Sequence, residues 1–178
     1  PDPQRILFIG RLEREKNLFA LVEALAGLTV ELWIVGDGHE RQALETLARE
    51  RQVNVHFLGI RPHAELPALL NGASAFILPS LWEGHPKTLL EAMSCGLPCI
   101  GSTIPAIRGV LTHGVNGWLC DPNASSIHQA IKEIMTQPIL REQLGQQARA
   151  YAVDHLGLEG VVRLELDLYR QLLPHRQP

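Results

Sequence analysis

The sequence predicts an α/β protein with a doubly wound parallel sheet of the Rossmann-like kind. Short apolar runs of strand length alternate with longer segments whose apolar residues recur at helical spacing. The run RILFIG at 5–10 is almost continuously apolar and ends in glycine, as a strand buried on both faces does. The chain has 178 residues, 46% of them hydrophobic, which is enough for one domain with a substantial core.

The expected strands share a short apolar run bounded by glycine, asparagine or proline. They lie at 5–10, 30–36, 53–58, 75–78, 97–101 and 117–120. The segments between and after them place apolar residues three and four positions apart, which predicts helices. Asn17 is expected to cap the first helix with its side chain, and Pro138 lies at the entry of a later one. The expected helices lie at 18–28, 39–51, 62–71, 88–95, 107–111, 124–136, 139–155 and 158–172.

Strands that alternate with helices predict parallel pairing with right-handed crossovers. In such a sheet, ligands bind beyond the carboxyl ends of the strands. The loops that carry the motifs described next follow Gly10, Gly36, Leu58, Leu78 and Gly101, all at expected strand ends. The sequence therefore predicts a ligand site at this edge of the sheet.

Two carboxylates, Glu83 and Glu91, stand eight positions apart in PSLWEGHPKTLLEAMSCGLPCI, on either side of a Gly-His-Pro turn. An ionised carboxylate only accepts hydrogen bonds, so each can hold hydroxyl groups, while a helix start supplies N–H groups for an anion. Two interpretations stay open for each residue. Glu91 completes a capping box with Thr88, or it binds a ligand. Glu83 is a solvated loop carboxylate, or it also lies in the site.

Arg11 and Lys16 follow the first expected strand. A guanidinium can grip phosphate oxygens with two parallel bonds, and an ammonium supplies a compact positive charge. Glu13 and Glu15 stand between them, so charge alone favours a solvated loop whose charges balance. Their position at a strand end favours a diphosphate site instead.

The turn Gly36-Asp37-Gly38 resembles the start of a dinucleotide-binding loop. Arg41 occupies the position of the third glycine in G-x-G-x-x-G, so a nicotinamide cofactor is disfavoured. The turn is either a plain strand end or part of a wall around a base.

Composition excludes several classes of function. The net charge is −3, and no basic cluster is interleaved with aromatic residues, so a nucleic-acid partner is not expected. No apolar run reaches transmembrane length, and no signal peptide is expected. The three cysteines, Cys95, Cys99 and Cys120, match no zinc spacing, and their odd number favours a reducing, cytoplasmic compartment. The eight histidines form no metal motif, so no metal site and no cofactor are expected.

The chain resembles the retaining glycosyltransferases of the GT-B fold, in particular group 1, also called family 4. The 79–100 segment resembles that family's EX7E signature. Further resemblances follow in the family's order: IGRLEREKN at 9–17, VGDGHER at 35–41, FLG at 57–59 and HGVNGWLCDP at 113–122. The resemblance implies that residues 1–178 form the nucleotide-sugar (donor) domain, one half of a GT-B fold. It also implies that the acceptor-binding N-terminal domain is absent from this chain and that no metal takes part.

The resemblance assigns roles residue by residue. Arg11 and Lys16 are expected to grip the donor diphosphate, Glu83 to lie near the donor sugar, and Glu91 to hold the ribose hydroxyls. The turn at Gly36 and the segment 59–62 are expected to form two walls around the base. The predicted catalytic residues are Arg11, Lys16 and Glu83. The predicted binding residues are Gly10, Arg11, Lys16, Gly36, Gly59, Gly84, His85, Pro86, Lys87, Thr88, Leu89 and Glu91.

Two positions depart from the family pattern. His85 stands where the family usually has an aromatic residue, and Gly109 stands where a glutamate is common. Two alternatives remain to a sugar transferase that is active in its full-length form, and the departures support the first of them. One is a nucleotide-sugar-binding module with weak or lost catalysis. The other is a different GT-B enzyme, such as a phosphorylase or a sugar-nucleotide epimerase. Any peripheral membrane contact is expected through the missing half.

The last expected helix, 158–172, carries more apolar residues than one stripe against a sheet requires. They are Leu158, Val161, Val162, Leu164, Leu166, Leu168 and Leu172. In the family this helix crosses back to the N-terminal domain, so we expect an exposed apolar face here, and self-association or a mobile C-terminus.

Overall fold

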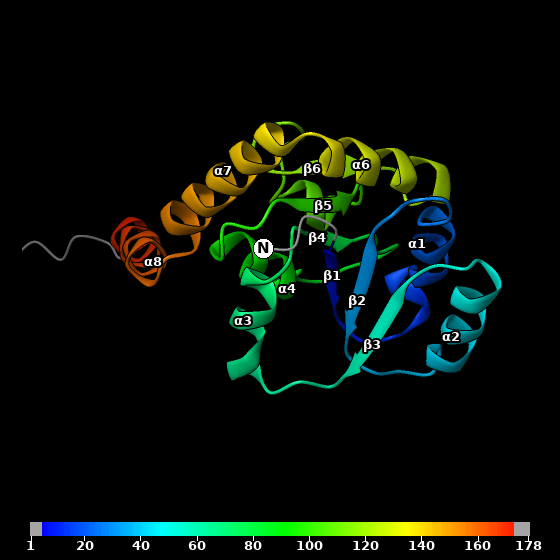
Figure 1. The fold of residues 1–178 in the computed structure, drawn as a ribbon. Helices are drawn as coiled ribbons and strands as arrows, with labels where there is room; N and C mark the ends of the chain where they lie inside the picture. Colours follow the sequence, from blue (N-terminus) through cyan, green and yellow to red (C-terminus); the bar gives the residue numbers. More distant parts are fainter. Residues whose placement is uncertain (1–4, 173–178) are drawn as a thin grey trace, which may run out of the picture.

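The structure of the chain is a computed structural model that describes residues 5–172, except the side chains at 156, 158, 159, 161 and 164. It confirms the doubly wound α/β class, because one six-stranded sheet has the order β3-β2-β1-β4-β5-β6 and every neighbouring pair is parallel (Figure 1). The strands are β1 (Arg5–Ile9), β2 (Glu31–Val35), β3 (Val55–Gly59), β4 (Ala75–Leu78), β5 (Cys99–Ser102) and β6 (Trp118–Cys120).

The strand order reverses at β1, which pairs with β2 on one side and with β4 on the other. The crossovers before and after this point lie on opposite faces of the sheet (Figure 1). The loops that follow β1 and β4 are neighbours at its carboxyl edge. In open α/β sheets the ligand binds in the crevice at this switch point. The predicted site residues follow these two strands.

Helices cover both faces of the sheet, with α1 and α2 on one face and α3 and α4 on the other (Figure 1). Helix α6 packs on α1, and α7 packs on α4. The helices are α1 (Leu18–Ala24), α2 (Arg41–Glu50), α3 (Leu66–Asn71), α4 (Lys87–Ser94), α5 (Pro105–Arg108), α6 (Ala124–Thr136), α7 (Pro138–Leu156) and α8 (Leu158–Leu172), with short 3₁₀ turns η1 (Arg14–Lys16) and η2 (His63–Glu65).

The core lies along β1, β4 and β5. All four residues of β4 and of β5 are buried, and Phe8 and Phe76 are among the largest fully buried side chains. Strands covered on both faces need continuous apolar runs, which is the pattern that predicted them. The outer strand β3 is only partly covered.

Some helices and strands begin at other residues than expected. The helix expected at 107–111 is α5, which starts at Pro105, because proline has the fixed φ and the missing N–H that suit a first helical position. The strand expected from residue 97 starts at Cys99, after Pro98, which has no N–H to pair. The helix expected at 62–71 is divided into η2 and α3.

The cysteines behave as small apolar residues. Cys99 and Cys120 are buried, Cys95 is half-buried, and all three are free thiols. Burial raises the pKa of the Cys120 thiol to about 12 and raises that of Cys99 as well, so both stay protonated at neutral pH.

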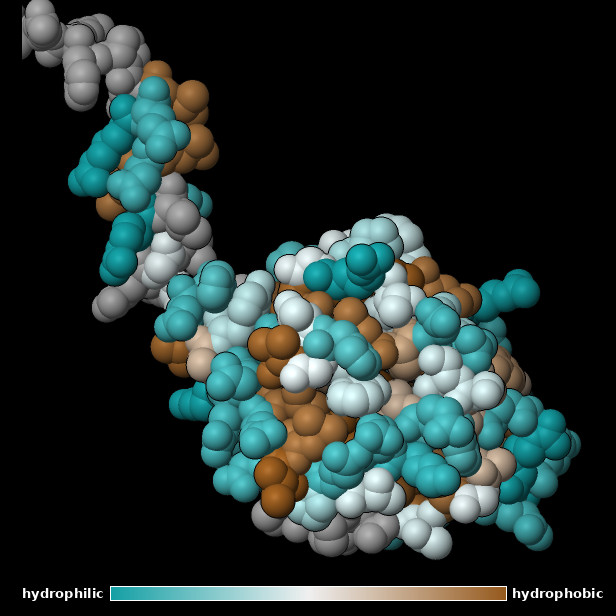
Figure 2. Space-filling view, turned by 90° about the horizontal axis from the view of Figure 1, so that it is seen from above, coloured by the Kyte–Doolittle hydropathy of each residue, from teal (hydrophilic) through white to brown (hydrophobic). Residues whose placement is uncertain are grey.

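Helix α8 extends from the end of α7 away from the body of the domain (Figure 1). Its surface is apolar along one side and polar along the other (Figure 2). Five apolar residues of α8 are exposed: Val162, Leu166, Leu168, Tyr169 and Leu172. Leu158, Val161 and Leu164 lie outside the described side chains. The expected exposure of apolar residues is confirmed for the described part of the helix.

We predict that this chain self-associates through α8, because covering exposed apolar surface lowers the free energy. The alternative expectation is that α8 is mobile and unfolds locally more readily than the sheet. Light scattering should show species larger than a monomer at tens of micromolar. Replacing Val162 and Leu166 with glutamate should restore a monomer, since both lie one turn apart on the exposed side. A strictly monomeric wild-type chain whose α8 amides exchange as slowly as those of β4 would contradict this prediction.

Candidate functional site

The centre of the predicted site is an ion pair between two loops far apart in the sequence. Lys16 Nζ lies 2.7 Å from Glu83 Oε1, and their side chains are only 14% and 8% exposed. Ser80 Oγ donates to the same carboxylate oxygen at 2.7 Å. Glu83 is therefore no solvated loop carboxylate, and the structure places it with Lys16 beyond the carboxyl ends of β1 and β4.

Backbone and hydroxyl contacts hold the loop after β4 in place. The Leu81 N–H donates to the Glu15 carbonyl at 2.8 Å, which joins this loop to the loop after β1. Ser102 Oγ, at the end of β5, donates to the Ser80 carbonyl at 2.6 Å. The Lys16–Glu83 pair thus lies on anchored backbone.

Asn17 does not cap α1 with its side chain, contrary to the expectation. Its backbone is left-handed, with φ 58°, and its side chain makes no capping bond. Instead Nδ2 donates to the carbonyls of Pro79 and Pro122, each at 3.0 Å. Asn17 therefore ties together the loops after β1, β4 and β6. Sequence reasoning missed this role, although asparagine's tolerance of left-handed backbone was a usable signal.

We predict that Asn17→Gly lowers the free energy of unfolding by about 2 kcal/mol, because glycine keeps the left-handed backbone and loses two hydrogen bonds. Asn17→Ala should lose about 1–2 kcal/mol more, since alanine is strained at this φ. Urea denaturation followed by circular dichroism measures both. A glycine variant as stable as the wild type would mean that the two bonds contribute nothing.

Arg11 lies at the rim of the site. Its side chain is 74% exposed, and Nη2 lies 2.9 Å from Glu15 Oε1, one helical turn along the chain. The structure thus brings Lys16 to Glu83 and leaves Arg11 at the surface. Exposed pairs of this kind are weak, so this guanidinium is available to another anion.

The capping-box interpretation of Glu91 is wrong. The Pro86 carbonyl accepts the first helical bonds, from Leu89 at 3.0 Å and Leu90 at 3.1 Å, so α4 begins at Lys87 and Thr88 lies inside its first turn. No side chain caps α4, and its first turn contains no acidic residue. Glu91 is too far along the helix to reach its start, so its carboxylate is left for other partners.

Glu91 Oε1 lies 3.3 Å from His63 Nε2, a residue of η2. Both line a mainly apolar hollow of about 270 Å³ between α3 and α4. The Glu91 side chain is about one-third exposed, so a ligand can reach it. His63 is a residue of this region that the sequence interpretation did not select.

The Gly36-Asp37-Gly38 turn requires glycine at position 36 for steric reasons, independently of any ligand. Gly36 has φ 134°, and a Cβ there would lie 1.9 Å from the Gly10 carbonyl oxygen. The Leu12 N–H donates to the Asp37 carbonyl at 2.9 Å, and the Gly36 N–H donates to the Gly59 carbonyl at 2.9 Å. Gly10, Gly36 and Gly59 therefore meet at the carboxyl ends of β1, β2 and β3.

The remaining predicted residues lie in the loop that leads into α4. Gly84, His85 and Lys87 are exposed, Thr88 is half-buried, and Pro86 and Leu89 are buried. Leu89 is fully buried, and its N–H donates to the Pro86 carbonyl at 3.0 Å. Gly109, where the resembling family often has glutamate, is exposed at the end of α5 with an ordinary φ of −68°.

Large apolar side chains surround this edge of the sheet. Trp82 is 67% exposed beside Glu83, and Leu81 and Ile60 are exposed as well. Within residues 5–172, no cluster of three metal-ligating side chains occurs, and no helix is long and apolar enough to cross a bilayer.

The sequence profile of the family described as glycosyl transferases group 1 matches residues 1–151. The chain belongs to this family. An uncharacterised glycosyltransferase of Methanocaldococcus jannaschii is 27% identical over 176 residues, which are 95% of this chain and 45% of that protein. The chain therefore spans about half the length of this group 1 relative.

Two solved structures share the fold of this group 1 chain. Sucrose-phosphate synthase from Thermosynechococcus elongatus superposes with a TM-score of 0.88 at 28% identity, over 96% of this chain and 46% of that one. HepE of Anabaena, solved in complex with UDP and glucose, has a TM-score of 0.86 at 22% identity, over 95% of this chain and 48% of its own. The latter likeness shows the fold alone.

Proposed function

We propose that this chain is the C-terminal, donor-binding half of a retaining, family 4 glycosyltransferase of the GT-B fold. It binds a nucleoside-diphosphate sugar without a metal ion, and the acceptor site lies in an N-terminal domain outside the chain. One observation carries the proposal: the mostly buried Lys16–Glu83 pair stands at the switch point of the sheet, beside the start of α4. Ligands of open α/β sheets bind at this point.

The diphosphate is the leaving group, so the donor half must stabilise the charge that develops on it. Lys16 has three N–H donors and spends one on Glu83, which leaves two for phosphate oxygens. Arg11 can leave its exposed pair with Glu15 and approach the same phosphates. The first turn of α4, which contains no carboxylate, adds a third positive element.

The two carboxylates take different roles in this proposal. Glu83 pairs with Lys16 at the switch point of the sheet and would lie near the donor sugar. Glu91 would accept hydrogen bonds from the ribose hydroxyls at the edge of the α3–α4 hollow. The names of the similar proteins support a sugar-transfer reaction, and the UDP and glucose bound to HepE support a nucleotide-sugar donor.

A binding module without catalysis is the second candidate, and one observation favours it. Gly109 cannot supply the carboxylate that the family often carries at this place, although its backbone would accept one. The full-length protein separates the candidates, because an enzyme hydrolyses or transfers the donor and a module does neither.

The proposal predicts that the chain binds UDP, GDP or ADP in the presence of a chelator, because Arg11 and Lys16 replace a metal as the counter-charge. Arg11→Ala should weaken that binding by about ten- to hundredfold through the loss of a charge-assisted contact. Arg49→Ala, which removes the same charge from the exposed side of α2, should leave it unchanged. Titration calorimetry decides, and binding that appears only with magnesium would overturn the metal-free part of the proposal.

A further inference from the structure

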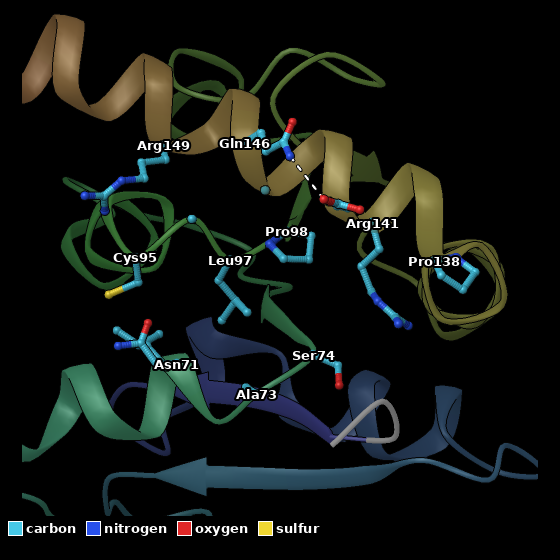
Figure 3. Close-up of a pocket in the computed structure, with 14 residues that line it drawn as sticks. Asn71, Ala73, Ser74, Cys95, Leu97, Pro98, Pro138, Arg141, Gln146 and Arg149 are labelled. Atoms are coloured by element: carbon cyan, nitrogen blue, oxygen red, sulfur yellow. Dashed lines mark hydrogen bonds between the residues drawn. The ribbon is translucent and has the colours of Figure 1, made fainter. Parts of the chain in front are cut away.

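A second hollow, of about 570 Å³, lies at the opposite edge of the sheet from Lys16 and Glu83 (Figure 3). It opens between the end of α3, the turns that lead into β4 and β5, and one face of α7. Ser74 directly precedes β4 and Pro98 directly precedes β5, so this is the amino edge of the sheet. Small-molecule sites commonly have a volume of this size.

The sequence of α7 explains why the hollow exists. The residues of α7 that line it follow one another at intervals of three and one, which places them on one helical face. They are Pro138, Arg141, Glu142, Gly145, Gln146 and Arg149. None of them is a large apolar residue that could fill the space. The apolar residues Leu144, Ala148 and Ala152 of the same helix are buried in the core instead.

A close backbone contact in the middle of α7 sets the shape of the hollow. A Cβ on Gly145 would lie 2.3 Å from the Gly96 carbonyl oxygen, so only glycine permits this approach. Gly96 itself has φ 73° and ends α4, with the Leu97 N–H donating to the Ala92 carbonyl at 3.1 Å. The helix touches the turn after α4 at this point and leaves space along the rest of its face.

Two arginines of α7 line opposite ends of the hollow (Figure 3). Arg141 Nη1 donates to the Met135 carbonyl at 3.2 Å, and Arg149 Nη1 donates to the Ser94 carbonyl. These bonds fix each guanidinium and use one of its five N–H donors. Within residues 5–172, neither arginine forms an ion pair, whereas Arg51 is paired with Glu23.

The rest of the lining suits an apolar group. Leu70, Leu97 and Pro98 form an apolar wall opposite α7. The single lining carboxylate, Glu142, accepts a hydrogen bond from Gln146 at 3.2 Å. The described lining therefore carries two positive charges against one negative charge, next to apolar surface.

We propose that this hollow is a second binding site, for a small compound that joins a phosphate or carboxylate group to an apolar body. The anionic group would be held by Arg141 or Arg149, because a guanidinium binds such oxygens with two parallel bonds. The apolar body would cover Leu97 and Pro98. The proposal does not rest on the proposed function, since no residue of the nucleotide site takes part.

Phenyl phosphate is a suitable probe, with inorganic phosphate and phenol as its two halves. In a ¹⁵N NMR titration of the chain, phenyl phosphate should shift the amides of Gly96, Leu97 and Gly145 in a saturable way. Either half alone should bind at least tenfold more weakly. Shifts confined to Lys87 and Thr88 would place the probe at the nucleotide site and would overturn the proposal.

Variants test the role of the arginines. Arg141→Gln with Arg149→Gln should weaken phenyl phosphate at least tenfold, and the two lysine substitutions should retain more of the affinity. Arg49→Gln with Arg163→Gln removes the same charge from exposed positions and should change nothing. Unchanged spectral dispersion confirms that each variant is folded. Equal affinity in the glutamine variant, or equal binding of phenol, would overturn the anion-binding role.

Discussion

Glu83→Ala is expected to destabilise the chain by about 3–5 kcal/mol, because it leaves the mostly buried Lys16 ammonium without a carboxylate. The same change removes the acceptor for Ser80 Oγ. The free energy of unfolding, from urea denaturation with the slope checked for two-state behaviour, measures this loss. A loss below about 1 kcal/mol would mean that water enters and solvates Lys16.

The double variant Lys16→Met with Glu83→Gln separates stability from function. Removing both charges should cost less than the sum of the single substitutions, because neither charge is then buried alone. The double variant should bind nucleoside diphosphate more weakly than the wild type, since the compact positive charge of Lys16 is gone. A double variant that recovers both stability and affinity would assign the pair a purely structural role.

The parallel pairing of the strands and the edge that holds the site could be predicted because they depend on residue patterns. Apolar runs separated by helical segments predict parallel strands, and the carboxyl ends of parallel strands share one edge. The sequence therefore placed Lys16 and Glu83 at the same edge. Their direct contact was beyond prediction, because it depends on how two anchored loops turn their side chains towards each other.

Local motifs failed where the surrounding structure overruled them. Thr88 and Glu91 have the spacing of a capping box, but Pro86 is the N-cap of α4, so the helix starts two residues too early for it. Asn17 precedes a helix as a cap does, yet its amide binds two carbonyls from distant loops. The hollow beside α7 also escaped prediction, because it depends on Gly145 meeting Gly96 at close range.

Gly36 packs against Gly10, at the start of the loop that carries Arg11 and Lys16. Its φ of 134° is a conformation that side chains rarely adopt, and its missing Cβ leaves room for Gly10. A Cβ would lie 1.9 Å from the Gly10 carbonyl oxygen and 2.9 Å from the carbonyl carbon, and both are backbone atoms that cannot rotate away. The Gly10 N–H also donates to the Val35 carbonyl at 2.9 Å, so the two loops cannot separate without losing this bond.

We therefore expect Gly36→Ala to lower the free energy of unfolding by about 3 kcal/mol or more, from steric overlap added to backbone strain. Gly27→Ala is the matched control, because Gly27 also has a positive φ, 80°, but nothing lies within 4 Å of its missing Cβ. The control should lose about 1–2 kcal/mol, from strain alone. Because Arg11 follows Gly10 directly, a folded Gly36→Ala protein should also bind nucleoside diphosphate more weakly. Equal losses in the two variants, measured by urea denaturation, would show that the contact with Gly10 is not what requires glycine at this position.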